Sequence, residues 1–464
     1  MTMKKKVKCL LKHIGELAER MQVSVYAVGG FVRDELLKRD CQEIDFVVTG
    51  DGPEFARAAC SALNGHGWVT YAKFGTASFL TGDLKLEFVT ARSESYESGS
   101  RNPRIEPSPL EEDLKRRDFT INTLAMSLDE ANFGTIIDLH NGKADIRQGM
   151  IRTPLDPEST FHDDPLRIMR AARFASQLAF EVDGATQEAM EKERTRLKIV
   201  SQERITEEML KILAHDTPSI GFRLLQRVRV LEIVFPELNA LKGIEQRDDY
   251  HHKDGFEHTM KVVDNVAGMT DSQDLRFAAL MHDIGKPRVK RFISGTGWTF
   301  YGHELVGVKM IPSICRRLKI SNTLCKYAVE LTRLHMRPIQ LIGEEVTDSA
   351  VRRLLFQAGD RIEDLMTLCR ADITSGNPDR VKKHMANFDR VARKMVAVEE
   401  KDRMRAFQSP VRGDEIMAVC GIGPGPQVGK LKTMIEEAIL EGEIPNDHDA
   451  AYAYLLKIKD NAHK

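Results

Sequence analysis

The chain has 464 residues, more than the roughly 250–300 at which a single hydrophobic core stops growing, so we expect roughly two to four domains. Hydrophobic residues make up 42% of the sequence and charged residues 30%, a balance that excludes an intrinsically disordered chain. The formal net charge of −1 gives no global signal for nucleic acid, so any nucleic-acid partner has to contact local basic surfaces.

The sequence also indicates a location. No stretch approaches the roughly 18 uninterrupted apolar residues of a membrane span. The opening MTMKKKVKCLLKHIGELAER is basic, but charges interrupt its apolar part, unlike a secretion signal. Seven cysteines are scattered without a CxxC pair, which argues against a disulfide framework or a zinc site. We therefore expect a cytoplasmic protein without a membrane partner.

The first predicted element is the stretch VYAVGGFVRD, in which a strand runs through a glycine turn into a helix. A helix that begins behind glycines offers backbone N–H groups and a positive dipole to a phosphate, with no Cβ in the way. Gly29 and Gly30 form this turn, and Arg33 lies in the first turn of the helix. The pattern indicates a phosphate site.

Two carboxylates follow in the next predicted strand. Glu43 and Asp45 are two residues apart and point to the same face, which is how a protein presents oxygen ligands to Mg²⁺. Glu87, in the strand LKLEFVT, adds a third carboxylate from a neighbouring strand. A phosphate site beside metal-binding carboxylates indicates nucleotidyl transfer, although a lone glycine pair or acidic pair is more often a turn or a solvated strand end.

The segment 92–113 is polar and broken by prolines, which predicts a long surface loop. The run RRDFTINTLA follows it. Together with GGFVRDELL, this run resembles the head domain of the bacterial-type tRNA nucleotidyltransferases and poly(A) polymerases of the polymerase-β superfamily. The resemblance implies that Glu43, Asp45 and Glu87 are catalytic and that the first two bind Mg²⁺. The sequence departs from the family at Glu43, where the family has aspartate, and the extra methylene displaces the carboxylate.

The resemblance also implies a nucleotide-binding site in the head. Its implied residues there are Gly29, Gly30, Arg33, Arg117, Asp118 and Asn122. An aspartate accepts a hydrogen bond from the ribose 2′-hydroxyl, and an arginine meets phosphate oxygens with two donors. The alternative is that the RRD cluster is only an exposed helix cap.

The segment FHDDPLRIMRAARF predicts a helix that begins at the paired aspartates before the proline. Asp164 and Arg167, three residues apart, share one face. They correspond to the family's EDxxR motif, in which the aspartate and arginine read the Watson–Crick edge and favour C and A. Arg170 and Arg173 complete the implied nucleotide site. Asp163 stands where the family has glutamate. As an alternative, these arginines are surface charges on a capped helix.

Histidines and aspartates recur through residues 250–375, in segments such as DGFEHTMKVV, ALMHDIGKP and YGHELVG. This pattern resembles the HD phosphohydrolase superfamily. The implied metal ligands are His258, His282, Asp283, His303, His335 and Asp372. Mixed imidazole and carboxylate coordination suits Mn²⁺, Fe²⁺ or Ni²⁺ as well as Mg²⁺. Such a site activates water for phosphoester hydrolysis, and by analogy with family members we expect 2′,3′-cyclic phosphodiesterase and phosphatase activity.

The expected fold is an α+β nucleotidyltransferase head, with a mixed sheet and helices, followed by mainly α-helical domains. The predicted domains are the head at 1–140, a neck with nucleotide-selecting helices at 141–235, an HD domain at 236–400 and a helical C-terminal segment at 401–464. In this last segment, the turn GPGPQVG either binds a tRNA phosphate or simply begins a helix, and both interpretations stay open.

The resemblance as a whole implies a CCA-adding tRNA nucleotidyltransferase that uses CTP and ATP, with Mg²⁺ in the head and a divalent metal in the HD domain. The family's CC-adding members lack a full-length loop before RRDFTIN, so its presence here favours A-addition. Alternatives are an A-adding enzyme, a poly(A) polymerase, an HD phosphohydrolase whose head only holds RNA, and an RNA-binding protein without turnover. Whether the chain forms a homodimer is left open.

Overall fold

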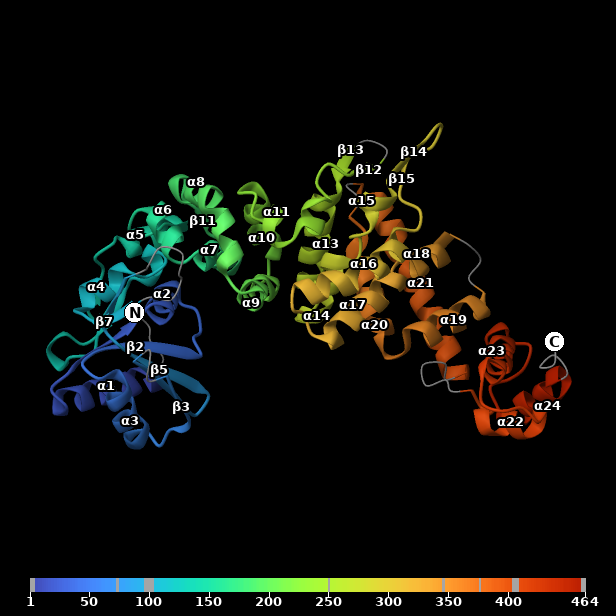
Figure 1. Cartoon of the computed structure of the whole chain (residues 1–464), viewed down its shortest axis with the longest axis horizontal. Coiled ribbons are helices and arrows are strands. Elements are labelled where there is room, and N and C mark those ends of the chain that lie inside the picture. The colour runs from blue at the N-terminus through green and yellow to red at the C-terminus, as the bar shows by residue number, and fades with distance from the viewer. Residues whose placement is uncertain are drawn as a thin grey trace. The chain divides into compact units, whose positions relative to one another are not determined.

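The computed structural model describes residues 5–71, 75–95, 104–248, 251–343, 347–374, 377–402 and 409–459. The chain divides into two compact units, Met1–Pro236 and Glu237–Lys464 (Figure 1). The predicted fold class is confirmed, because a mixed sheet with helices forms the start of the chain and helices dominate the rest. The boundaries of the four predicted domains stay a prediction. Within the described residues, no helix is both long and apolar enough to cross a membrane.

In the described part of the first unit, the main sheet has the strand order β3-β4-β5-β2-β1-β8-β9. The strands are β1 Ser24–Val28, β2 Glu43–Thr49, β3 His66–Tyr71, β4 Thr76–Thr81, β5 Leu84–Thr90, β8 Ala125–Ser127 and β9 Ile136–Ile137. β2 and β5 are parallel and their neighbours pair antiparallel. The sheet is therefore mixed, as the sequence predicts.

Alternation along β2 and β5 separates a core face from a polar face. On the core face, the rings of Phe46 and Phe88 stack with centroids 4.6 Å apart, and Phe55 from helix α3 (Gly52–Ala62) packs against Phe88 with centroids 5.6 Å apart. The intervening residues Glu43, Asp45 and Glu87 then point to the opposite face, with Asp45 directly across from Glu87 in the register. Burial of the phenylalanines thus fixes where the carboxylates lie.

The helices of the first unit surround this sheet and continue beyond it. They are α1 Lys5–Arg20, α2 Gly30–Leu37, α3, α4 Leu110–Lys115, α5 Gly142–Gln148, α6 Pro157–Asp163, α7 Leu166–Leu178, α8 Gly184–Glu193, α9 Gln202–Leu213, α10 Pro218–Arg227 and α11 Leu231–Val234, with the 3₁₀ helices η2 Thr120–Asn122, η3 Glu130–Asn132 and η4 Arg194–Ile199. A short parallel pair joins β10 Met150–Ile151 to β11 Glu181–Val182. Helix α7 packs against both α9 and α10. A Cβ on Gly221 of α10 would lie 2.7 Å from the Ala172 carbonyl oxygen, so glycine permits this close approach.

One sequence prediction in this unit is wrong. The segment 92–113 is not a continuous loop, because β6 Arg92–Ser95 pairs antiparallel with β7 Arg104–Pro107 and α4 follows; residues 96–103 lie outside the described part. Polar side chains suit an exposed two-stranded ribbon as well as a loop, so composition did not distinguish them. The sequence left Asp163 and Asp164 as alternative starts of the arginine-rich helix. Asp163 ends α6, and the carboxylate of Asp164 accepts from the Leu166 N–H at 3.2 Å, so Asp164 is the aspartate at the start of α7.

The second unit is helical in its described part, apart from two short hairpins. Its helices are α12 Pro236–Asn239, α13 Gly255–Met269, α14 Gln273–Met281, α15 Lys286–Val289, α16 His303–Arg317, α17 Asn322–Leu334, α18 Met336–Gly343, α19 Asp348–Ala358, α20 Ile362–Asp372, α21 Pro378–Asp402, α22 Gly413–Cys420, α23 Pro426–Glu441 and α24 His448–Ile458, with the 3₁₀ helix η5 Gly359–Arg361. The hairpins are β12 Glu245–Asp248 with β13 His251–Asp254, and β14 Arg291–Ile293 with β15 Gly297–Thr299.

Helix α14 is the centre of this unit. Its residues from Leu275 to Met281 are all buried, and it packs against α13, α17 and α20. When a helix is surrounded by other helices on every side, its C-terminal end also lies in the protein interior. The two residues that follow it, His282 and Asp283, are therefore buried as well.

One buried carboxylate anchors α4 beside the sheet. Asp113 is completely buried, and its Oδ1 accepts from Arg116 Nη2 at 2.5 Å while Oδ2 accepts from Arg117 Nη2 at 3.0 Å. Burial by itself raises the pKa of Asp113, but the two guanidinium groups outweigh it and hold the pKa below the ordinary value. Asp113 thereby orients two arginines of the RRD run.

Replacing Asp113 by alanine should lower the free energy of unfolding of the first unit by about 3 kcal/mol, because both guanidinium groups lose their buried partner. Urea unfolding followed by Trp68 fluorescence, in a Trp298→Phe background, measures this unit alone. Glu112→Ala is the matched control on the same helix, since Glu112 pairs with Lys115 at the surface and should cost under ~1 kcal/mol. Equal effects of the two variants would contradict the assignment.

Candidate active sites

Every head residue that the sequence singled out lines one cavity of about 750 Å³ in the first unit. These residues are Gly29, Gly30, Arg33, Glu43, Asp45, Glu87, Arg117, Asp118, Asn122, Asp164, Arg167, Arg170 and Arg173. They come from β2 and β5, from the glycine turn and α2, from the 116–122 segment, and from Asp164 and α7, which are far apart in the sequence. The cavity is therefore assembled by the fold, and it is large enough for a nucleotide.

The carboxylates lie together on the polar face of the sheet. One oxygen each from Glu43, Asp45 and Glu87 lies within 4.8 Å of the others, an arrangement of hard oxygen donors that fits Mg²⁺. Burial, and then the charges of Glu43 and Glu87, raise the pKa of Asp45 to about 6. Lys85 contacts Glu43 and lies 3.3 Å from Glu87. The three carboxylates thus concentrate negative charge that a bound cation would neutralise.

The glycine turn differs from its prediction in one respect. Gly29 adopts the left-handed conformation with φ of 68°, and its own N–H already donates to the Leu124 carbonyl at 3.0 Å. A Cβ there would lie 3.1 Å from Arg117 Nη1. Gly29 thus contributes backbone shape and room for Arg117, while its N–H is committed to the Leu124 carbonyl.

A chain of hydrogen bonds crosses the floor of the cavity. Arg33 Nη1 donates to Asn122 Oδ1 at 2.8 Å, Asn122 Nδ2 donates to Asp118 Oδ1 at 2.9 Å, and Arg170 Nε donates to Asp118 Oδ2 at 2.7 Å. Burial raises the pKa of Asp118, but Arg170 and Asn122 outweigh burial and hold it well below the ordinary range. Asp118 is therefore ionised and joins α2 to α7 across the cavity.

The remaining α7 side chains are held from outside the helix. Arg167 Nη2 donates to the Arg116 carbonyl at 2.6 Å, and Arg173 pairs with the buried Glu208 of α9 at 3.2 Å. The ring of Phe174 faces three guanidinium groups, with the Arg173 Cζ 4.4 Å from its centroid. Glu208 and Phe174, like the cavity-lining Lys211 of α9, were missed from the sequence. Only Phe174 had a signal, since it lies four residues after Arg170 on the same face.

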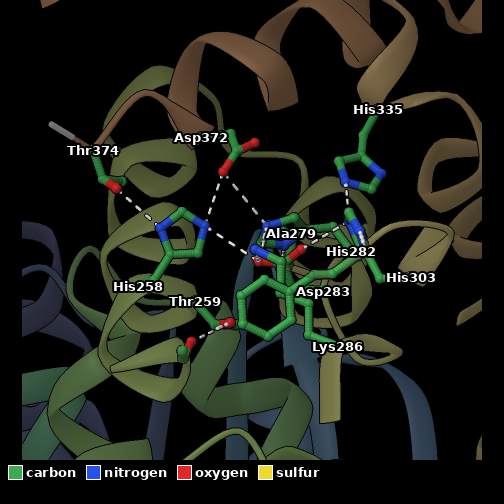
Figure 2. Close-up of polar contacts among 12 residues, drawn as sticks. His258, Thr259, Ala279, His282, Asp283, Lys286, His303, His335, Asp372 and Thr374 are labelled. Carbon is green, nitrogen blue, oxygen red and sulfur yellow. Dashed lines mark hydrogen bonds and ion pairs between the residues drawn. The ribbon is translucent and has the colours of Figure 1, made fainter. Parts of the chain in front are cut away.

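The six predicted residues of the second unit also converge (Figure 2). Their ligand atoms form two groups, one of His258, His282 and Asp372 and the other of Asp283, His303 and His335, each within 4.8 Å. They lie at the ends or in the first turns of α13, α14, α16, α17 and α20, which meet around the buried end of α14.

The imidazoles are oriented so that every Nε2 faces the centre. The Nδ1 atoms of three histidines donate to backbone carbonyls. His282 donates to Ala279 at 2.7 Å, His303 to Phe300 at 3.0 Å and His335 to Thr332 at 2.7 Å. His258 Nδ1 lies 2.9 Å from the Thr374 hydroxyl. Because a carbonyl only accepts, Nδ1 carries the proton in these three rings, and the Nε2 lone pair is available to a metal.

Charges and distances at this centre fit a metal. His303 Nε2 lies 3.1 Å from His335 Nε2, and burial together with His282 lowers the pKa of His335 to about 4. Asp283 outweighs burial and raises the pKa of His282 to about 10, so in the absence of a metal Nε2 also holds a proton, which a bound cation would displace. The buried His282 Nε2 lies 3.2 Å from Asp283 Oδ2 and 3.6 Å from Asp372 Oδ1, so imidazole nitrogens and carboxylate oxygens converge here. A divalent cation would satisfy these atoms, and the mixed donor set suits Mn²⁺, Fe²⁺, Ni²⁺ or Mg²⁺.

Comparisons with known proteins match the parts of the chain that carry the two candidate sites. Residues 25–152 match the poly A polymerase head domain, residues 179–242 match a probable RNA and SrmB-binding site of polymerase A, and residues 255–376 match the HD domain.

Two relatives illustrate the similarity. The multifunctional CCA protein of Ralstonia nicotianae is 35% identical over 365 residues, which cover 75% of this chain and 81% of that protein. The A-adding tRNA nucleotidyltransferase of Deinococcus radiodurans is 29% identical over 435 residues, 91% of this chain and 93% of that protein.

Solved structures share the fold. The CCA-adding enzyme of Bacillus stearothermophilus in complex with CTP is 25% identical, with a TM-score of 0.69 over 99% of both chains. The Thermotoga maritima CCA-adding enzyme complexed with tRNA is 21% identical, with a TM-score of 0.60 over 100% of this chain and 97% of that one.

The raised pKa of Asp45 predicts a pH-dependent stability. A group whose pKa is raised on folding stabilises the protein at low pH, and that stability is lost as the pH rises through about 6. Asp45→Asn should therefore raise the melting temperature of the metal-free first unit at pH 8, by the equivalent of about 1–3 kcal/mol, and change it little at pH 4. Trp68 fluorescence during heating reports it. The exposed Asp83→Asn is the control, and a gain for Asp45→Asn at pH 4 alone would refute the prediction.

The Thr374 hydroxyl should matter for metal binding, because it holds the ring of His258 in place. We expect Thr374→Val to weaken Mn²⁺ binding at this centre about 10- to 100-fold, as measured by electron paramagnetic resonance of free Mn²⁺. Thr259→Val is the matched control, since Thr259 is also a buried threonine but its hydroxyl donates to the Gly255 carbonyl of its own helix. Unchanged affinity in Thr374→Val would show that the hydroxyl does not position the ligand.

Proposed function

The chain belongs to the family of the multifunctional CCA proteins, which are tRNA nucleotidyltransferases, and on that premise we propose that it adds C, C and then A to tRNA 3′ ends from CTP and ATP. The observation that carries the proposal is the single cavity that combines three carboxylates with the nucleotide-binding residues. Similar solved structures are complexes with tRNA, with CTP, or with a primer tRNA and an ATP analogue.

Each residue has a role in this proposal. Glu43 and Asp45 would hold Mg²⁺, with Glu87 as the third carboxylate. Bound there, Mg²⁺ supplies activation of the tRNA 3′-hydroxyl and stabilisation of the departing pyrophosphate. Arg117, fixed by Asp113, faces the triphosphate, and Asp118 retains acceptor capacity for the ribose 2′-hydroxyl because a carboxylate has about four lone-pair sites.

Selection of the base would fall to α7. The Asp164 carboxylate accepts from an exocyclic amine, which C and A have and U and G lack at the corresponding position. Arg167 donates to a ring acceptor, and its bond to the Arg116 carbonyl holds the guanidinium in one orientation. Arg170 and Arg173 are fixed by Asp118 and Glu208, so the protein surface itself serves as a rigid template.

We propose a second activity at the HD centre, the metal-dependent hydrolysis of a phosphoester such as a 2′,3′-cyclic phosphate at an RNA end. Its support is the set of Nε2 atoms that converge with two carboxylates. Bound there, Mn²⁺, Fe²⁺, Ni²⁺ or Mg²⁺ would supply a water of lowered pKa. The four histidines and two aspartates hold the position, and Lys286, 2.6 Å from Asp283, adds positive charge beside it.

A second candidate for the head is addition of A alone. The A-adding relative from Deinococcus radiodurans aligns with 91% of this chain, whereas the multifunctional CCA relative aligns with 75%. Its similarity therefore extends over more of this chain. The two candidates share the same cavity and differ only in which tRNA ends the enzyme extends.

We expect the purified protein with Mg²⁺ and labelled CTP or ATP to extend tRNA transcripts that end before CCA, after C and after CC. Extension of the shortest transcript by C, C and A supports the first candidate. Incorporation of A on the CC-ended transcript alone would replace it with the second. No incorporation would refute both.

The two activities should separate by mutation. Asp45→Asn should lower nucleotide incorporation at least ~100-fold, since a catalytic metal supplies several kcal/mol and each ~1.4 kcal/mol is a factor of ten. His282→Ala should abolish hydrolysis of a cyclic phosphate and leave incorporation at the wild-type level. If His282→Ala impaired incorporation as strongly as Asp45→Asn does, the two sites would not be independent.

A further inference from the structure

The hairpin β14–β15 lies between two ligands of the HD centre along the chain. After Asp283 the chain forms α15 and then the two strands, and it returns through Phe300 to His303. The Phe300 carbonyl accepts from His303 Nδ1 at 3.0 Å, and the Lys286 ammonium lies 5.7 Å from the Phe300 ring. In Figure 1, β14 and β15 project from the helices of their unit. Both ends of this projection are thus tied to the centre.

Aromatic side chains are exposed on this excursion. Phe292 is 65% exposed, Trp298 38% and Tyr301 77%. Phe292 and Trp298 pair across the strands with ring centroids 5.3 Å apart. This pairing stabilises the hairpin, but it leaves much of both rings open to solvent, and Tyr301 lies outside the ladder. We call Phe292, Trp298 and Tyr301 the aromatic platform.

Positive charge accompanies the aromatic platform. Between residues 284 and 303 the sequence contains Lys286, Arg288, Lys290 and Arg291 and no aspartate or glutamate. Arg288 and Arg291 are exposed, and the Lys290 ammonium lies 4.4 Å from the Trp298 ring centroid. Aromatic faces interleaved with cations bind single-stranded nucleic acid, because bases stack on the rings and phosphates pair with the cations. A second copy of this basic hairpin, or an apolar protein surface, would lack the negative charge that these cations match.

We propose that the aromatic platform binds the single-stranded 3′ end of an RNA and guides it to the HD centre. This inference rests on the proposed hydrolysis at that centre, and it names an RNA end, rather than a mononucleotide, as the preferred substrate. Bases stack on Phe292, Trp298 and Tyr301 while Arg288 and Arg291 pair with the phosphates. The excursion that carries these residues leads directly to the ligand His303.

Trp298 provides its own test. In the full-length Trp68→Phe protein it is the one remaining tryptophan, since the sequence has two. Titration with a short single-stranded RNA in the presence of Mn²⁺ should quench its fluorescence saturably. Phe292→Ala and Tyr301→Ala should each weaken the binding about tenfold, and Arg291→Ala should reduce the salt dependence by roughly 0.7 in the log–log slope. Met269→Ala, an exposed apolar residue on α13, is the control and should bind RNA normally.

The outcome separates this inference from the hydrolytic function. The wild-type protein should hydrolyse an oligonucleotide 2′,3′-cyclic phosphate in preference to a mononucleotide 2′,3′-cyclic phosphate. Loss of this preference in Phe292→Ala supports the aromatic platform. Quenching without hydrolysis of either substrate also supports the platform and removes the proposed hydrolysis. The inference is overturned if RNA does not quench the Trp298 fluorescence. It is also overturned if Phe292→Ala, Tyr301→Ala and Met269→Ala bind RNA with equal affinity. Both conclusions hold even if the mononucleotide is hydrolysed. Concentration-dependent self-association without RNA quenching overturns it in favour of a second copy.

Discussion

The ion pair between Asp118 and Arg170 is the constraint on which the head cavity depends. A carboxylate this deeply buried requires compensation, because an unpaired buried charge costs several kcal/mol. Arg170 supplies that compensation from α7, and Asn122 extends the network to Arg33 on α2. The sheet side of the cavity and the helix that carries the base-selecting residues are therefore held at a defined separation. Asp113 and Glu208 fix Arg117 and Arg173 in the same way.

The second unit also has to compensate buried charged and polar groups. Its centre brings four imidazoles and two carboxylates into buried space, where unsatisfied polar atoms are costly. Backbone carbonyls fix the tautomer of three rings, so that the Nε2 lone pairs point at one another. A cation at this point satisfies an arrangement that hydrogen bonds alone leave incomplete. Both candidate sites therefore gather carboxylates and other metal-ligand atoms that a divalent cation would balance.

Several features could be predicted because their physical cause is local. Alternation in β2 and β5 places Glu43, Asp45 and Glu87 on one face, and short motifs identified both sites. Other predictions failed, or left two alternatives open, where the same sequence pattern is compatible with two structures. The polar segment that forms β6 and β7 has the composition of a loop. Asp163 and Asp164 are both good helix caps, and only the end of α6 distinguishes them. The N–H of Gly29 is engaged by Leu124, which no feature of VYAVGGFVRD indicates.

The sequence by itself determined which side chains share one face of a strand or helix, because strand alternation and helix periodicity act over only a few residues. It also determined the motifs, because a motif depends only on the order of residues along the chain. It did not determine which partner each side chain has. Arg167, Arg170 and Arg173 are chemically identical, and their separate partners lie 35 to 52 residues away in the sequence. Thr374 reaches His258 across 116 residues. Only tertiary packing decides such pairings, because burial makes each hydrogen bond depend on distant backbone positions that local preferences do not encode.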